Sequence, residues 1–194
     1  MDKDLDFIPG EFIELRKLKV TDAEVTMKWR NSARASLLNR ATSSLDEQIA
    51  WIARRPDSEQ NYIIQTRQGL PVGMLSLINI DLEHMRAESG RFLIGDEEAV
   101  KGIPAAVESM KLLYDLAFKH YKLQRVYGTV ASANTLMIKW QKYLGMKEEG
   151  RLRRHYFIDG RFQDAVCLGI LAEEYEKDAK PRMMALMKIS NNKL

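Results

Sequence analysis

The segment over residues 95–106 has the residue types that point most directly to binding chemistry. A strand-like stretch ends at Ile94, and Lys101 and Gly102 then precede a long helix-like stretch. Free backbone N–H groups and the positive end of the helix dipole meet at a helix start, and glycine lets an anion approach the backbone. The pattern predicts a phosphate site, although a plain turn with Pro104 in the first helical turn has the same signature.

Other kinds of reactive site receive little support. Cys167 is the only cysteine and lies in an apolar run, so a small buried side chain is the simplest interpretation. The three histidines lack the spacing and the carboxylate neighbours of a metal motif, and we predict no metal site. A net charge of +3, from 30 basic and 27 acidic residues, is too small to indicate nucleic-acid binding. The basic residues within 151–154 could meet a phosphate or form a solvated face.

The elements that would position these residues follow from the periodicity of apolar side chains. We expect strands over residues 12–18, 62–66, 72–80, 87–94, 125–130, 150–158 and 162–171. Helices are expected after capping boxes at Thr21 and Ser44, and over residues 103–121 and 134–144. The 194 residues, 45% of them hydrophobic, fit one domain with no membrane span or signal peptide, and we expect a cytoplasmic protein.

Several segments resemble the GNAT N-acetyltransferase superfamily. Asn134, with Gly145 eleven residues later and a strand after it, looks like the acetyl-CoA-binding half. Residues 15–22 and 45–51 are similar to the ribosomal-protein N-terminal acetyltransferase branch. Residues 28–31 and 73–80, Glu88, Gly90 and the Lys101–Gly102 turn look most like acetyltransferases of nucleotide-linked 4-amino sugars in pseudaminic acid biosynthesis. The likeness spans roughly residues 12–171.

The resemblance implies an α/β (α+β) fold of three layers. Its mostly antiparallel mixed sheet would have about seven strands, flanked by about four helices, with residues 87–94 and 125–130 as splayed central strands. The domain would cover residues 1–173. Residues 174–194 would form a tail whose apolar side chains at helical spacing suggest a helix docked on the domain or on a second subunit.

The resemblance also implies acetyl-CoA as co-substrate, with its pantetheine arm between the splayed strands and its pyrophosphate on the turn. An acceptor amine would attack the thioester directly, so neither a metal nor a nucleophilic thiol is required. The residues that this places at the cofactor are Leu93, Ile94, Lys101, Gly102, Ile103, Ala105 and Asn134.

Two departures from the family pattern affect the chemistry. The turn has Ala99 in place of a basic or amide residue, and Pro104 has no N–H to donate. The tyrosine that often protonates the leaving thiolate is replaced by Gln141. Tyr143 is the nearby candidate acid, but two residues along a helix turn its side chain about 200° away, which favours packing.

Glu88, in the strand beside the expected cleft, is the candidate general base, acting directly or through a water. A solvent-facing residue paired with Arg91 is the alternative interpretation. His84 is a second titratable candidate, although its position between two strands favours an exposed loop.

Acceptor recognition is assigned to the first two helices and the loop after them, and the candidate substrate residues are Trp29, Arg30, Asn31, Gln48 and Asn79. Trp29 would offer a stacking plane and Arg30 a fork for phosphate or carboxylate, a set suited to a nucleotide diphosphate sugar. A core tryptophan with an incidental arginine is equally compatible. Gln48 stands where the amino-sugar enzymes often have histidine, so the sugar or nucleotide could differ from theirs.

We therefore predict an acetyl-CoA-dependent N-acetyltransferase that acts on a small primary amine, most simply a nucleotide-linked amino sugar, as a monomer or homodimer. The alternatives are acetylation of a protein or peptide amine and a non-catalytic acyl-CoA-binding module. No nucleic-acid or membrane partner is expected.

Overall fold

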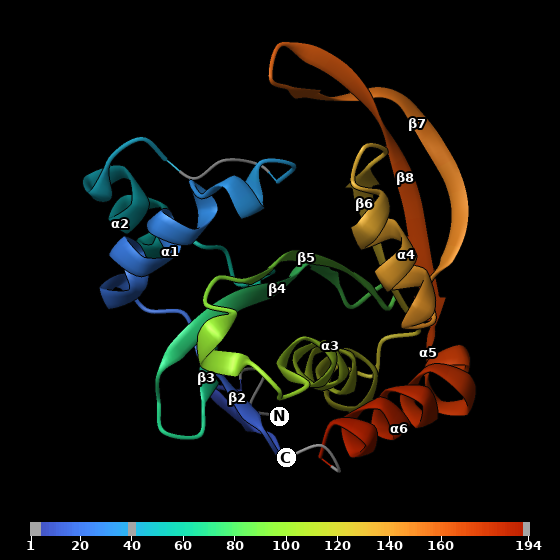
Figure 1. Ribbon diagram of the computed structural model, residues 1–194. Helices are drawn as coiled ribbons and strands as arrows, with labels where there is room; N and C mark the ends of the chain where they lie inside the picture. The colour runs from blue at the N-terminus through green and yellow to red at the C-terminus, as the bar shows by residue number, and fades with distance from the viewer. Residues whose placement is uncertain (1–4, 39–41, 192–194) are drawn as a thin grey trace.

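A mixed sheet of eight strands forms the centre of the computed structural model, which describes residues 5–38 and 42–191 (Figure 1). The strands are β1 (Phe7–Pro9), β2 (Ile13–Lys17), β3 (Gln60–Thr66), β4 (Pro71–Asp81), β5 (Arg86–Ile94), β6 (Arg125–Ala131), β7 (Lys147–Ile158) and β8 (Arg161–Leu171). Their order is β1-β2-β3-β4-β5-β6-β8-β7, and only β5 and β6 pair in parallel. The predicted sheet type is confirmed. The extra strand, β1, has three residues, too few for a periodic signal.

The helices lie close to the predicted segments. They are α1 (Ala23–Arg30), α2 (Leu45–Ala53), α3 (Ala105–Asp115), α4 (Thr135–Tyr143), α5 (Ala172–Glu174) and α6 (Lys180–Asn191). The cap at Ser44 is confirmed, since its Oγ accepts a hydrogen bond from the Glu47 N–H at 3.2 Å. The cap at Thr21 is wrong: the Asp22 carboxylate accepts from the Lys19 N–H at 2.8 Å, and α1 begins at Ala23.

Helices cover both faces of the sheet, because successive strand residues point to opposite sides. Ile64 and Leu75 belong to the larger core that contains the buried face of α3. Their neighbours Ile63 and Met74 pack instead with Trp29 of α1. The predicted three layers are therefore present. No helix in the described part of the chain is long and apolar enough to cross a membrane.

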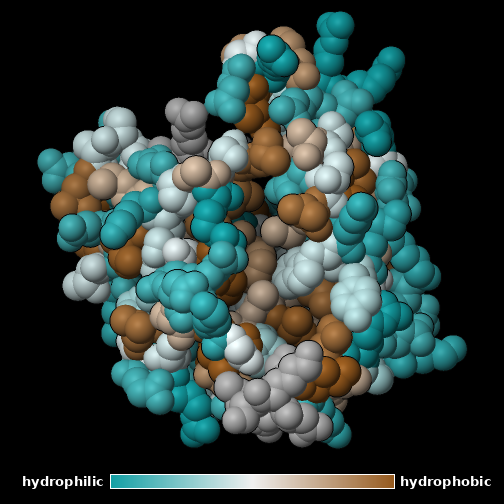
Figure 2. Space-filling model, in the orientation of Figure 1, coloured by the Kyte–Doolittle hydropathy of each residue, from teal (hydrophilic) through white to brown (hydrophobic). Residues whose placement is uncertain are grey.

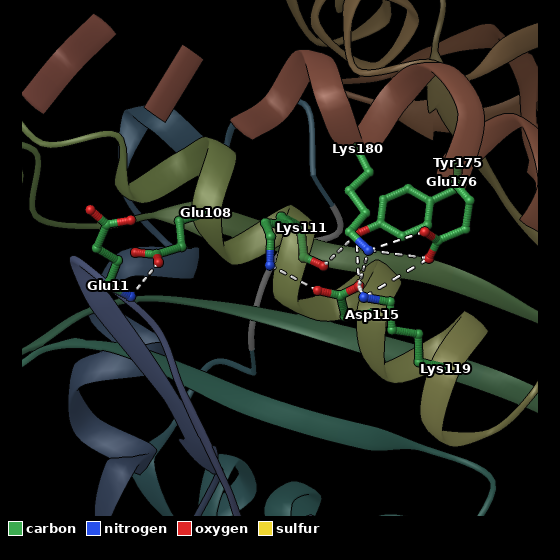
Figure 3. Close-up of polar contacts among 8 residues, drawn as sticks. All are labelled: Glu11, Glu108, Lys111, Asp115, Lys119, Tyr175, Glu176 and Lys180. Carbon is green, nitrogen blue, oxygen red and sulfur yellow. Dashed lines mark hydrogen bonds and ion pairs between the residues drawn. The ribbon is translucent and has the colours of Figure 1, made fainter. Parts of the chain in front are cut away.

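A buried carboxylate attaches α3 to the start of β2. The Glu108 side chain accepts a hydrogen bond from the backbone N–H of Glu11 at 2.5 Å (Figure 3), and further ones from the N–H groups of Phe12 and Ile13 at 2.8 and 2.9 Å. Glu108 lies in the first turn of α3, where a negative charge also complements the helix dipole. This contact fixes the end of α3 that follows the Lys101–Gly102 turn.

Candidate active site

The central strands separate after a short parallel ladder. β5 and β6 pair only at Arg86 with Arg125, Ala87 with Val126, and Glu88 with Tyr127. Beyond Glu88, β5 carries a bulge against β4, where the register shifts. Arg91 in this bulge has a φ of 54°, a left-handed conformation that bends the strand away from its neighbour. The splay that the resemblance implies is thus present.

A cavity of about 350 Å³ lies at this gap. Its walls include Arg30 and Met74 from the α1 side of the sheet, and Met110 and Leu113 from the α3 side. Figure 2 shows a hollow with apolar walls between the α1–α2 region and the region of α4 and the β7–β8 hairpin. Because the walls come from both layers, a donor and an acceptor could enter the gap from different sides of the sheet.

The turn before α3 has backbone features that suit an anion. Gly102 has a φ of 84°, a conformation that glycine adopts without strain, and α3 starts three residues later. Pro104 occupies the N-cap position of α3. The Lys101 side chain is 76% exposed, with its Nζ 3.4 Å from a Glu98 carboxylate oxygen. An anion at this turn would therefore be bound by the backbone N–H groups at the start of α3 and by the positive end of the helix dipole.

The other predicted cofactor residues divide between side-chain and backbone roles. Asn134 lines the cavity and caps α4, since its Oδ1 accepts from the Met137 N–H at 3.2 Å. Leu93, Ile94 and Ala105 are buried in the core, so only their backbone could face a cofactor, whereas Ile103 packs against the core and is partly exposed. Phe92 of β5 stacks on Trp140 of α4, with ring centroids 4.9 Å apart, and links the two sides of the gap.

Glu88 lies in the cavity wall and belongs to the last residue pair of the parallel ladder. Its Oε2 accepts a hydrogen bond from Asn79 Nδ2 at 3.0 Å. Asn79, one of the predicted acceptor-binding residues, contacts Glu88 and does not line the cavity. His84 is exposed in the turn between β4 and β5, where its N–H donates to Asp81, and it is also absent from the lining.

Tyr143 does not reach this cavity. It is 53% exposed, and it is not among the lining residues, whereas Gln141 is buried and lines the wall. The prediction of Tyr143 as a catalytic residue is contradicted, for the geometric reason given by helix periodicity: the two side chains lie on different faces of α4.

Tyr156 of β7 is a cavity residue that the sequence pattern did not reveal. Its hydroxyl lies 2.7 Å from Thr129 Oγ1, and both side chains line the wall. Tyr156 pairs with Gln163 of β8 next to a bulge in β7, so its side chain reaches past β8 to β6. Only the position of this bulge brings the hydroxyl to the gap, and no local sequence signal marks it.

The predicted acceptor residues lie in different parts of the structure, and only some of them line the cavity. Trp29 is 7% exposed and packs in the core under α1, so it offers no stacking plane to a ligand, and that prediction is contradicted. Asn31 is exposed and absent from the lining, and its Nδ2 donates to the Thr42 carbonyl at 3.4 Å. Gln48 lines the cavity and donates to Thr26 at 3.2 Å. Trp51 of α2, not predicted, supplies the aromatic surface there instead.

Arg30 lines the cavity although it is only 9% exposed. Burial, and then the positive charge of Arg91, lower the pKa of Arg30 to about 10. Arg91 lines the same wall, with its guanidinium 5.2 Å above the Trp51 ring. Two guanidinium groups therefore line the same cavity, near enough for the charge of Arg91 to affect the pKa of Arg30.

Comparison with known proteins agrees with this geometry. The model of the acetyltransferase (GNAT) domain matches residues 13–147. This chain belongs to the GNAT acetyltransferase family. GNAT enzymes use acetyl-CoA, so the chain is an N-acetyltransferase with acetyl-CoA as its donor.

Several GNAT relatives carry names that specify an acceptor. Spermidine N(1)-acetyltransferase of Escherichia coli strain K12 is 29% identical over 131 residues, which are 68% of each chain. The Vibrio cholerae enzyme of the same name is 29% identical over 119 residues, 61% of this chain and 67% of that one. A crystal structure of the Vibrio cholerae spermidine N-acetyltransferase with CoA and spermine superposes with a TM-score of 0.75 and 25% identity, covering 85% of this chain and 98% of that one.

No three His, Cys, Asp or Glu side chains in the described ranges, residues 5–38 and 42–191, are placed to hold a metal ion. Direct attack by an amine on a thioester needs none.

Proposed function

We propose that this GNAT enzyme transfers the acetyl group of acetyl-CoA to the primary amine of a small acceptor, by direct attack within a ternary complex. The observation that carries the proposal is a cavity with walls from both sides of the splayed sheet and the Glu88 carboxylate in one of them. A thioester between β5 and β6 and an amine arriving from the α1 side would meet beside Glu88.

Glu88 acts as the base in this scheme. Glu88 takes a proton from the acceptor ammonium, or from the amine as the new N–C bond forms. Asn79 Nδ2 meanwhile donates a hydrogen bond to Oε2 of the same carboxylate at 3.0 Å. The C–S bond breaks, and the leaving thiolate receives a proton. Gln141 has no acidic proton to give, so Tyr156 is the donor, its hydroxyl oriented by Thr129.

The acceptor that we propose is a nucleotide-linked amino sugar. Gln48 and Arg30 supply an amide and a guanidinium on the acceptor side of the cavity, and Trp51 supplies an aromatic face. A polyamine is the second candidate, because relatives of known name acetylate spermidine. A protein or peptide amine and a purely acyl-CoA-binding role are the remaining alternatives.

Release of free CoA thiol tests the proposal. The enzyme, saturated with acetyl-CoA, is given UDP- and dTDP-linked amino sugars, spermidine and short peptides in parallel. Turnover of the amino sugars above the rate of background hydrolysis supports the sugar acceptor. Turnover confined to spermidine or to peptides would contradict the sugar acceptor and identify a polyamine or a peptide amine in its place. Acetyl-CoA binding by calorimetry without any transfer would support the non-catalytic module.

A further inference from the structure

We infer that the wall formed by Arg30 and Arg91 is a subsite for an anionic group, phosphate or carboxylate, carried by the acceptor, and that this subsite excludes polyamines. The inference rests on the proposed function and narrows its acceptor class. It departs from the acceptor that the relatives' names suggest.

Arg91 is held in a fixed orientation. Its Nη1 donates to Glu59 Oε2 at 2.9 Å and to Asn61 Oδ1 at 3.0 Å, and its Nη2 donates to Glu59 Oε1 at 3.2 Å. The strained bulge and the Trp51 ring confine it further. A guanidinium held by three hydrogen bonds loses little further entropy when a ligand binds, which favours recognition of a planar anion.

Arg30 brings a second guanidinium into the same wall from the end of α1. The two like charges disfavour each other in a poorly solvated place, as the lowered pKa of Arg30 reflects. An anion between them would relieve that repulsion and form charge-assisted hydrogen bonds.

The carboxylates around the cavity complete the charge balance. Glu59 is engaged by Arg91 and Arg55 and is not among the residues that line the cavity. In the described part of the chain, the charged side chains of the wall are Arg30, Arg91 and Glu88. Glu59 is shared by Arg91 and Arg55, so the three guanidiniums of Arg30, Arg55 and Arg91 outnumber the carboxylates of Glu59 and Glu88 here, and a polyamine would add further ammonium groups to this positive excess. An amine with an anionic group can put its amine at Glu88 and its anion at the arginines.

A substitution pair separates recognition from folding. Arg30→Met removes the cation from the cavity wall. Arg55→Met is the matched control. Arg55 also pairs with Glu59, and its guanidinium lies 4.1 Å above the Trp51 ring, but Arg55 does not line this cavity. Melting temperature and the KM for acetyl-CoA report whether each variant is folded and binds its donor.

The test compares kcat/KM for UDP- and dTDP-linked amino sugars, free amino acids, glucosamine and spermidine. The wild type is expected to prefer one of the anionic classes over glucosamine and spermidine by at least about tenfold, the worth of one hydrogen bond to a charged group. Arg30→Met should lose that preference with its KM for acetyl-CoA unchanged, and Arg55→Met should keep it.

Two results would overturn the inference. One is equal or better turnover of spermidine, and the other is an unchanged preference in Arg30→Met; both leave acetyl transfer to an amine intact. If no amine is acetylated, the proposed function fails instead. Calorimetry with UDP then tests the subsite separately. Binding of UDP to the wild type that is lost in Arg30→Met would support the anionic subsite, and absence of binding to the wild type would contradict it.

Discussion

Glu88 belongs to the last residue pair of the β5–β6 ladder, and its carboxylate lies in the wall of the cavity beyond that pair. We expect Glu88→Gln to lower kcat/KM by about 10² or more, because a positioned base contributes that much to proton transfer. The measurement is CoA-thiol release at saturating acetyl-CoA. Asn79→Ala, which removes the hydrogen bond to Glu88 and also places alanine at a left-handed φ of 51°, should have a smaller effect on kcat/KM. Full activity in Glu88→Gln would remove the residue from the mechanism.

Tyr156 and Tyr143 form a second matched pair. Tyr156→Phe should reduce kcat by about tenfold or more with little change in the KM for acetyl-CoA, since the lost hydroxyl is the proposed proton donor. Tyr143→Phe removes a hydroxyl from the exposed face of α4 and should leave kcat unchanged. Steady-state kinetics on both variants decides the matter: equal effects, or a larger effect at Tyr143, would rule out the assignment.

At the residue level, short patterns predict local features. The glycine turn at Lys101–Gly102 and a helix over residues 134–144 were expected from residues a few positions apart, and α4 begins next to Asn134. Trp29 and Arg30 are adjacent on α1, yet one is in the core and the other in the cavity. Tyr156 and Trp51 reach the cavity through a bulge and through helix packing, which are tertiary features without a local signature.

The contact between β5 and α1 couples the donor strand to the acceptor side. Gly95 follows β5, and a Cβ added there would lie 2.3 Å from Cγ of the Trp29 ring. We expect Gly95→Ala to cost about 1–3 kcal/mol of unfolding free energy through overpacking, and to raise the KM of the acceptor because α1 also carries Arg30. Urea denaturation and steady-state kinetics measure the two effects.

Gly150→Ala is the matched control for this substitution. A Cβ at Gly150 has no atom within 4 Å, and it should change neither the unfolding free energy nor the KM appreciably. If Gly95→Ala behaves like Gly150→Ala, α1 adapts without loss and the coupling is absent.

The order and type of the elements were largely predictable, because long strands and helices carry periodic apolar patterns. The structural features that the sequence did not predict are local ones. The α3 helix continues as a π-helical turn, Leu116–His120, and the bulge at Arg91 changes the register of β5. Both depend on how the segment packs against the rest of the sheet, which no short sequence window contains.

At the scale of the whole molecule, Asp115 joins α3 to the C-terminal segment. Its carboxylate lies 2.8 Å from Lys111 Nζ and 2.7 Å from Lys119 Nζ, and it accepts from the Tyr175 hydroxyl at 3.1 Å (Figure 3). Burial opposes the charged form, but the hydrogen bonds and charges of the two lysines prevail and lower the pKa of Asp115. Tyr175, Ala179 and Met183 then continue the core toward α6.

The lowered pKa has a defined consequence for stability. The stabilisation is present above the pKa of about 3.9 of an unfolded aspartate, and it is lost as the pH falls through the lower pKa of the folded state. Asp115→Asn should therefore cost about 1–3 kcal/mol at pH 7, and the difference from wild type should shrink toward pH 3. Denaturation at several pH values measures it. The exposed Asp57→Asn serves as control, and a difference that grows on acidification would contradict the assignment.

The three-pair ladder between β5 and β6 leaves the two halves of the sheet sharing few backbone hydrogen bonds. A ligand that fills the gap bonds only to the folded state, so occupancy adds to the unfolding free energy by mass action. At a hundred times its Kd, CoA should contribute about 2.7 kcal/mol. A thermal scan against CoA concentration should therefore show a melting temperature that climbs logarithmically, by roughly 5–10 °C at that concentration. The enzyme's resistance to heat and proteolysis would in this way follow the supply of its own donor substrate.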